Sequence, residues 1–366
     1  ISNPGQKRRG FLVILGSSMK KKIILGSLVL ILLVTGFIGY KLFSPAVSNK
    51  QGNYFYIKNG ETLAGVKEEL KFNQFISADG FDLACKLLKY KKVKPGRYKL
   101  KDGMSLYRLT KMLRNGEQTD VKLVINKERT KEQFAGKFGP GKKFDSAFDS
   151  LQMINFLKNN DSLKKYGVDS NTALSIIMPY TYNTKWNSTP DKIFQQFYTA
   201  YQKFWTSERK IKADTLHLTP LQVISLASIV EEETNKKADK YNIASTYLNR
   251  IRIGMKLQAD PTVKFAMKNF ALKRVLGVHL KTDSPYNTYM YAGIPPGPIC
   301  TPSPETIDAV LDAPKTEYLY FVASHKFDGT SVFTTNFNDH LKYARLYQQE
   351  LTRRMDSVSK AKQKPQ

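Results

Sequence analysis

Three consecutive glutamates, Glu231, Glu232 and Glu233, are the side chains of this sequence best placed for acid–base chemistry. They follow a segment in which apolar residues recur at helical spacing, namely Val223, Leu226, Ala227 and Val230. At 3.6 residues per turn Glu231 borders this apolar stripe, whereas Glu232 and Glu233 point away from it by about 100° and 200°. Because desolvation and acidic neighbours both disfavour a charged carboxyl, we expect Glu231 to be partly buried with a raised pKa. Cleavage of a glycosidic bond requires such a protonated carboxyl.

The helix that carries these glutamates should begin at Thr219 and Pro220, because threonine is a favoured N-cap and proline a favoured first helical residue. The simpler interpretation is a helix end with three solvated glutamates, and periodicity alone favours it. The loops that follow favour a site. LQADPT (257–262), SPYNTY (284–289) and GIPPGPI (293–299) are rich in turn residues and in groups that bind sugar hydroxyls, and loops of this kind often line sites.

IVEEET and these loops, together with NRIRIGMKLQADPTV, GIPPGPICTP and YLYFVA, resemble the YceG-like (MltG) endolytic murein transglycosylase family over about residues 50–350. The resemblance implies a membrane-anchored lytic transglycosylase that cleaves MurNAc–GlcNAc bonds in nascent peptidoglycan strands, leaves 1,6-anhydro-MurNAc ends and limits strand elongation. It also implies the site residues. Glu231 is the catalytic carboxyl, and the supporting or substrate-binding residues are Glu233, Gln258, Asp260, Tyr286, Asn287 and Tyr289.

Two segments depart from the family's pattern. LSIIMPYTY stands where the family has a segment like E-G-Y-L-F-P-D-T-Y, so Leu174, Ser175 and Tyr180 occupy the Glu, Gly and Asp positions. Arg129 stands where a glycine is expected in an E-G-x-T motif. These departures affect one wall of the expected cleft and leave the Glu231 region untouched.

In the implied reaction, protonated Glu231 donates to the glycosidic oxygen, and its carboxylate then accepts the proton of the muramic C6 hydroxyl as that oxygen attacks C1. Two other interpretations stay open. A two-carboxylate muramidase would hydrolyse the same bond with Glu233 or Asp260 as base or nucleophile. A peptidoglycan-binding scaffold of the cell-wall synthesis machinery would bind glycan with little turnover. We expect a cell-wall synthase complex as the protein partner.

The N-terminal region sets the expected compartment. Residues 23–40 form a run of 18 residues without a charge, preceded by lysines at 20–22. This pattern predicts a single-pass anchor in the cytoplasmic membrane over 19–43, with the rest of the chain outside the cytoplasm. A cleaved signal peptide is the competing interpretation. Residues 1–18 are expected to be an over-extended start or a cytoplasmic tail.

The charge balance indicates anionic partners. The 366 residues include 58 Lys and Arg against 31 Asp and Glu, a net charge of +27. Outside the cytoplasm, the expected counterparts are the membrane and peptidoglycan rather than nucleic acid. Residues 86–101 hold eight basic side chains and no acidic one, interleaved with Tyr90 and Tyr98. This stretch suits docking on a polyanion or a sugar chain, although solvated strand edges also favour lysine.

Residues 57–70 and 100–113 form an internal repeat with an offset of 43. Each copy has the pattern of a strand end, an Asn-Gly or Asp-Gly turn and a helix, with Thr62 and Ser105 as the expected N-caps. An alternating strand around Leu123 should close the same core. The repeat also resembles the LysM-like N-terminal part of the family.

The chain is therefore expected to be an α+β protein. After the anchor, a small LysM-like α+β module should occupy 49–126, and a larger, mostly helical catalytic domain with a small β-sheet should occupy 127–357. The four histidines lack metal-ligand spacing and the sequence has no glycine-rich phosphate loop, so neither a metal nor a cofactor is expected. Cys85 and Cys300 fall in different domains and should be free thiols.

Overall fold

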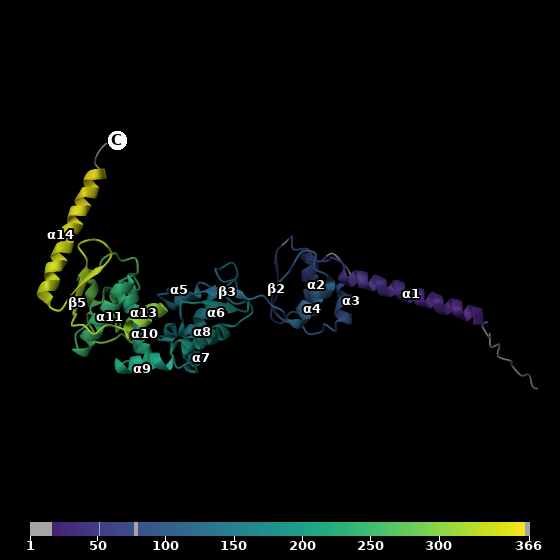
Figure 1. Cartoon of the computed structure of the whole chain (residues 1–366), viewed down its shortest axis with the longest axis horizontal. Helices are drawn as coiled ribbons and strands as arrows, with labels where there is room; N and C mark the ends of the chain where they lie inside the picture. Colours follow the sequence, from purple (N-terminus) through teal and green to yellow (C-terminus); the bar gives the residue numbers. More distant parts are fainter. Residues whose placement is uncertain (1–16, 51, 77–79, 363–366) are drawn as a thin grey trace, which may run out of the picture. The chain divides into compact units, whose positions relative to one another are not determined.

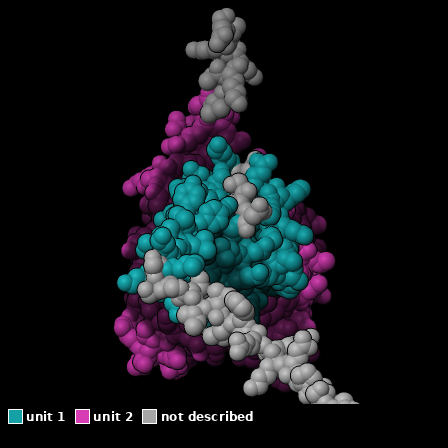
Figure 2. All heavy atoms as spheres, turned by 90° about the vertical axis from the view of Figure 1, so that its right-hand side faces the viewer, with its two compact units in different colours: residues 1–119 teal, residues 120–366 magenta. Residues whose placement is uncertain are grey.

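The computed structural model describes residues 17–50, 52–76 and 80–362. Of the expected start at 1–18, residues 1–16 lie outside this described part. The chain divides into two compact units, residues 1–119 and 120–366 (Figure 1, Figure 2). Both units contain helices and short antiparallel sheets, so the prediction of a mixed helical and sheet protein is confirmed.

Helix α1 (Ser17–Phe43) is the apolar helix expected near the N-terminus. Its segment Met19–Phe43 is 25 residues long, and an 18-residue window within it has a mean hydropathy of 2.5 and no buried residue. By length and composition it can cross a membrane. Its orientation in a membrane stays a prediction.

Unit 1 has the repeated arrangement predicted from its sequence. Strand β1 (Tyr54–Ile57) precedes α2 (Leu63–Phe72), and β2 (Gly96–Lys99) precedes α4 (Leu106–Asn115). A further helix, α3 (Phe81–Leu87), lies between the two copies. β1 and β2 pair antiparallel, and both copies contribute to one hydrophobic core.

The two expected N-caps of unit 1 are confirmed. The side chain of Thr62 accepts a hydrogen bond from the amide of Gly65, and that of Ser105 accepts one from the amide of Arg108. Whether this unit is LysM-like stays a prediction.

The basic stretch 86–101 presents lysines at the surface but not its tyrosines. Tyr90 and Tyr98 are almost fully buried in the core of unit 1. The expectation that these rings take part in docking is therefore wrong, because the residues between the lysines point inward to fill the core. Exposed lysines such as Lys91 and Lys92 remain available.

Unit 2 holds the remaining elements. In chain order they are β3 (Val121–Val124), α5 (Lys131–Ala135), α6 (Ser150–Lys158), α7 (Asn160–Lys164), η1 (Ala173–Ile176), β4 (Thr181–Thr184), α8 (Pro190–Phe204), α9 (Ser207–Thr215), α10 (Pro220–Glu233), α11 (Lys237–Arg252), α12 (Asp260–Ala266), η2 (His279–Lys281), α13 (Pro304–Leu311), β5 (Tyr320–Ala323), β6 (Ser331–Thr334) and α14 (Phe337–Lys362).

Strand β3 is the alternating strand expected around Leu123, but it does not close the core of unit 1. It pairs antiparallel with β4 of unit 2, so that Leu123 lies opposite Tyr182. The buried side chains of β3 alternate with exposed ones, as the sequence predicts. Alternation identifies a strand without identifying its partner, and for this reason the predicted pairing was wrong.

Helix α10 lies at the centre of unit 2. It begins as predicted, with Pro220 in its first turn and a capping box between Thr219 and Gln222. All eight residues from 223 to 230 are buried, because α9, α11, α12, α13 and η1 all contact this helix. Helices α9, α11 and α13 are labelled near it in Figure 1. This part of the helix therefore has no single apolar face, and the three glutamates directly follow a segment that is buried on every side.

The C-terminal part of unit 2 consists of the β5–β6 hairpin and α14. The first turn of α14 packs against β5, where the rings of Tyr320 and Phe337 are 5.6 Å apart. His340 also stacks on Tyr320, at 5.5 Å. The rest of α14 projects away from the other helices of unit 2 (Figure 1).

The lysines before the apolar segment predict the orientation of the full-length protein. A reporter that is active only outside the cytoplasm should be active when fused to the C-terminus, because positive charges retain the preceding segment in the cytoplasm. The same fusion without residues 19–43 should be inactive. Activity of a reporter that works only in the cytoplasm would show that the predicted orientation is wrong.

Candidate active site

An open pocket of about 480 Å³ lies at the C-terminal end of α10, and all three glutamates line it. Its other lining residues are Lys127, Arg129, Thr234, Asn235, Lys236 and Gly329. We call it the glutamate pocket. Since α10 is surrounded by other elements and successive residues differ by about 100°, each of the three carboxyl groups meets a different neighbour.

The carboxylate of Glu231 is held by the N-terminal end of α13. Its Oε2 accepts hydrogen bonds from the hydroxyls of Ser303 (2.9 Å) and Thr306, and from Lys240 Nζ (3.2 Å). The ion pair is largely buried, with side chains 13% and 8% exposed for Glu231 and Lys240. Ser303 is also the N-cap of α13. Glu231 therefore connects the C-terminal end of α10 with the N-terminal ends of α11 and α13.

These contacts reverse the expected protonation of Glu231. Burial alone would raise its pKa, but the hydrogen bond from Thr306, the charge of Lys240 and the hydrogen bond from Ser303 together lower it below the usual value. The expectation of a raised pKa at Glu231 is therefore wrong. Its partial burial beside an open pocket is as predicted.

Glu232 is paired with two basic residues. Arg129 donates from Nε (3.0 Å) and Nη2 (2.7 Å) to its Oε2, and Lys127 Nζ lies 3.1 Å from its Oε1. The Glu232 side chain is only 12% exposed, so it is not the solvated side chain that the sequence suggested. Burial would raise the pKa of Glu232, but these partners lower it.

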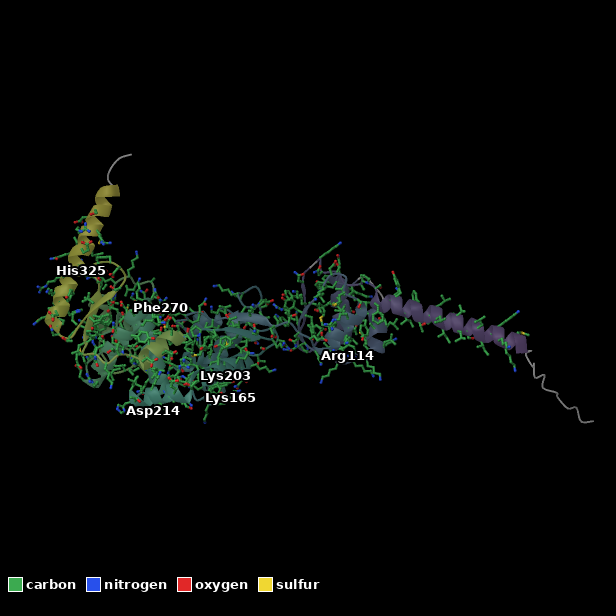
Figure 3. All side chains as sticks on the ribbon, in the orientation of Figure 1. Arg114, Lys165, Lys203, Asp214, Phe270 and His325 are labelled. Atoms are coloured by element: carbon green, nitrogen blue, oxygen red, sulfur yellow. The ribbon has the colours of Figure 1, made fainter. Side chains whose placement is uncertain are left out.

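The Arg129 guanidinium also lies over the ring of Phe270, 5.4 Å from its centroid (Phe270 is labelled in Figure 3). The residue that replaces the expected glycine is therefore part of the pocket wall.

Glu233 has a different environment. Its one side-chain hydrogen bond within the described part of the chain comes from the hydroxyl of Tyr247, 2.7 Å from Oε1. Burial raises the pKa of Glu233 to about 7, and the charge of Asp260 adds to this effect. The hydrogen bond from Tyr247 and the charges of Lys264 and Arg250 offset only part of the rise. Glu233 can therefore hold a proton near neutral pH.

Two of the predicted residues lie near Glu233 at the start of α12. The hydroxyl of Tyr289 donates to Asp260 Oδ1 at 2.7 Å, and the charge of Asp260 acts on Glu233. The expected loop 257–262 is only partly a loop, because its last three residues form the first turn of α12. Gln258 is exposed and has a left-handed backbone, with φ of 49°.

The other two predicted residues do not face the glutamate pocket. Asn287 is fully buried, and its amide donates to the carbonyls of Leu280 (2.9 Å) and Thr282 (2.8 Å). It therefore organises the 280–289 loop. Tyr286 packs its ring against Phe265 at 4.7 Å and lines a neighbouring pocket.

Sequence reasoning missed the partners that distinguish the three carboxyl groups. Tyr247 and Lys240 both come from α11. The apolar periodicity of α11 predicts which side of that helix is buried, but not which carboxyl group its polar side chains contact. Arg129 and Lys127 come from a segment about one hundred residues earlier, where Arg129 was noted only as a departure from the family. No group of three His, Cys, Asp or Glu residues suited to a metal ion occurs in the described part of the chain.

Comparison with known proteins agrees with these features. The sequence matches the YceG-like family over residues 55–346. It is 30% identical to the endolytic murein transglycosylase of Bacillus subtilis, over 80% of this chain and 83% of that protein. It is 27% identical to the endolytic murein transglycosylase of Streptococcus pneumoniae R6, over 71% of this chain but only 52% of that longer protein.

The fold is also similar to a solved structure. A YceG-like protein from Listeria monocytogenes shares the fold, with a TM-score of 0.52 and 23% identity, over 79% of this chain and 97% of that one. The extent of the family match and the identity to the Bacillus protein agree with the resemblance seen in the motifs. The chain described here therefore belongs to the YceG-like family.

Proposed function

We propose that this chain is a membrane-anchored endolytic lytic transglycosylase that cleaves MurNAc–GlcNAc bonds in nascent peptidoglycan strands and leaves 1,6-anhydro-MurNAc ends. The names of its relatives support murein as the substrate. The observation that carries the proposal is the pair of neighbouring carboxyls in an open pocket, one ionised (Glu231) and one with a pKa of about 7 (Glu233).

In this proposal Glu233 acts twice. Its protonated carboxyl donates to the glycosidic oxygen as the bond from that oxygen to C1 of the muramic residue breaks. The resulting carboxylate then accepts the proton of the C6 hydroxyl, whose oxygen forms the new bond to C1. Glu233 is protonated again by the C6 hydroxyl and no water is consumed, so the step is an intramolecular substitution at C1 rather than hydrolysis.

Glu233 replaces Glu231 as the proposed acid because of what each carboxyl contacts. A general acid must hold a proton near the working pH, and a carboxylate that accepts from two hydroxyls and a buried lysine favours the charged form. Glu231 therefore serves as a fixed anion that positions the end of α10. Glu232 has a similar role towards Arg129 and Lys127.

The proposal also assigns roles outside the pocket. Helix α1 anchors the enzyme in the cytoplasmic membrane, with unit 2 on the outer side. Unit 1, as a LysM-like module, holds the enzyme near glycan and membrane through its exposed lysines. Cleavage of nascent strands would limit their elongation, which places the enzyme beside a cell-wall synthase complex.

A hydrolytic muramidase is the second candidate, because the charge of Asp260 acts on Glu233 and two interacting carboxyl groups are the usual equipment for hydrolysis. The two reactions give products of different mass. Hydrolysis adds one water to the muramic end, whereas the proposed intramolecular substitution does not.

The first prediction separates the three glutamates by activity. Glu233→Gln keeps the size of the side chain but cannot exchange the proton, so turnover should fall by about 10²–10⁴-fold while glycan binding persists. Glu232→Gln and Glu231→Gln should retain measurable turnover at temperatures where they are folded. Digestion of nascent strands followed by mass spectrometry measures both the rate and the product. A folded but inactive Glu231→Gln beside an active Glu233→Gln would overturn this assignment.

The second prediction concerns pH and Tyr247. Activity should decline as the pH rises above about 7, because Glu233 loses its proton there. The Tyr247 hydrogen bond lowers the pKa of Glu233, so Tyr247→Phe should move this decline to higher pH. Tyr166→Phe is the matched control, since its hydroxyl bonds Asp191 away from the pocket. An identical pH profile for Tyr247→Phe and the wild type would contradict the assigned role.

The third prediction is thermodynamic. The pKa of Glu233 is raised on folding, so the native state binds more protons than the unfolded state between pH 4.5 and about 7, and stability falls as the pH rises through this range. Glu233→Gln removes this loss of stability. The change in melting temperature that the substitution causes, relative to wild type, should therefore be more positive at pH 8 than at pH 4.5.

Glu231 has the opposite sign and provides the control for that experiment. Its pKa is lowered on folding, so it adds stability above pH 4.5 that is lost as the pH falls through the lowered value. Glu231→Gln should therefore lower the melting temperature at pH 7, and less so in stronger acid. Parallel shifts for both variants at every pH would show that the two carboxyls do not differ as described.

A further inference from the structure

A second pocket of about 340 Å³ adjoins the glutamate pocket along the same wall of unit 2. Arg129 lines both of them, and it also lines a smaller pocket of about 170 Å³ together with Glu232, Lys264 and Phe270. We call the 340 Å³ cavity the basic pocket. Its lining residues are Arg129, Thr130, Lys131, Glu132, Lys158, Ser170, Asn171, Leu174, Phe265, Ala266, Lys268, Ser284, Tyr286 and Pro298.

One side of the basic pocket is apolar and held in place by tight packing. The rings of Tyr286 and Phe265 are 4.7 Å apart. Gly297 lies so close to this side that a Cβ would meet the carbonyl oxygen of Asn171 at 2.8 Å and the Tyr286 hydroxyl at 3.1 Å. A side chain at position 297 would therefore clash with the backbone of Asn171 and press against the hydroxyl of Tyr286. The apolar surface also includes Leu174, which occupies a position where the family resemblance leads one to expect glutamate.

The rest of the basic pocket is positively charged. Lys131, Lys158 and Lys268 line it in addition to Arg129, against a single acidic residue, Glu132. Glu132 is 3.5 Å from Lys158, and Arg129 is paired with Glu232. The other two cations, Lys131 and Lys268, form no direct salt bridge in the described part of the chain, and the charges of Glu132 and Asp169 act on Lys131 from a greater distance.

Lys131 is the cation most affected by its surroundings. Its Nζ donates to the carbonyl oxygen of Ser170 at 2.6 Å, which uses one of the three donors of an ammonium group. Burial lowers the pKa of Lys131. A partly desolvated ammonium with unused donors is favourable for an anion, because the anion returns the electrostatic stabilisation that burial removes.

We propose that the basic pocket binds a carboxylate of the peptide branch that is attached to the muramic acid residue of the substrate. This inference rests on the proposed function, in which the glycan occupies the glutamate pocket. The peptide branch of peptidoglycan combines small apolar side chains with carboxylate groups, and the basic pocket combines an apolar side with ammonium groups. The cations of the glutamate pocket are already engaged by Glu231 and Glu232, whereas the basic pocket has more cations than carboxylates, so an anionic branch is favoured in the basic pocket.

The test compares glycan strands that differ only in the branch. One sample carries intact peptides, and the other has been stripped by an amidase that leaves only the lactyl carboxylate on the sugar. The full-length protein in detergent micelles is assayed as wild type and as the double variant Lys131→Gln/Lys268→Gln. The control is Lys203→Gln/Lys210→Gln, which removes the same charge from exposed positions on α8 and α9 (Lys203 is labelled in Figure 3).

For strands with peptides, the double variant should raise KM by about tenfold relative to wild type, as expected for the loss of a charge-assisted hydrogen bond. For stripped strands the rise should be at most about twofold, and the control should match the wild type on both. An equal effect on both samples, or no effect on either, would overturn the proposal.

A binding measurement keeps the two proposals distinguishable. Calorimetric titration of the full-length protein with a soluble muramyl peptide should show weaker binding for the double variant than for wild type. If this difference is found and no strand is cleaved, the proposed function fails and the basic pocket stands. If a glycerol phosphate polymer competes with the muramyl peptide at equal charge concentration, the pocket binds anions without preference for the peptide, and the inference is wrong.

Discussion

The structure of unit 2 depends on one electrostatic constraint, which is the placement of three carboxyl groups at the end of a buried helix. Residues 223–230 of α10 are buried on every side, and its last turn holds Glu231, Glu232 and Glu233 without a basic residue. The partial negative charge of a helix C-terminus adds to that of these side chains. A buried unpaired carboxylate is costly, so α10 can occupy this position only if the surrounding elements supply donors, cations or protons.

The neighbouring elements supply cations and hydrogen-bond donors to two of the three carboxyl groups but not equally to the third, and this difference gives the pocket its chemistry. Glu231 forms an ion pair with Lys240 and accepts hydrogen bonds from two hydroxyls at the start of α13. Glu232 forms ion pairs with Arg129 and Lys127. Among the described residues, Tyr247 alone donates a side-chain hydrogen bond to the third carboxyl, Glu233, whose burial favours the protonated form. The contacts that make the helix end stable thus also leave one carboxyl in a form that can act as an acid.

Features that depend on nearby residues could be predicted from the sequence, and features that depend on tertiary neighbours could not. The N-caps Thr62, Ser105 and Thr219 were predictable, because a cap bonds an amide only two or three residues away. The difference between Glu231 and Glu233 was not, because the argument assumed a helix with one buried face. When every side of a helix is buried, the spacing of the residues predicts that the carboxyl groups point in different directions but not which neighbours they meet. The family resemblance pointed to the IVEEET segment, but a motif carries no information on which carboxyl meets a cation.

Arg129 shows how a single departure from a family pattern alters a whole charge arrangement. With glycine at this position, Glu232 would have only Lys127 as a cation, and its less compensated charge would raise the pKa of Glu233 further through repulsion. With arginine, the guanidinium neutralises Glu232, lies over Phe270 and lines all three adjoining pockets. It thereby connects the glutamate pocket, where carboxylates and cations are paired, to the basic pocket, where cations are in excess. A substrate whose neutral sugar backbone carries an anionic branch would be stabilised more with its branch in the basic pocket, and this difference favours one orientation of the strand over its reverse.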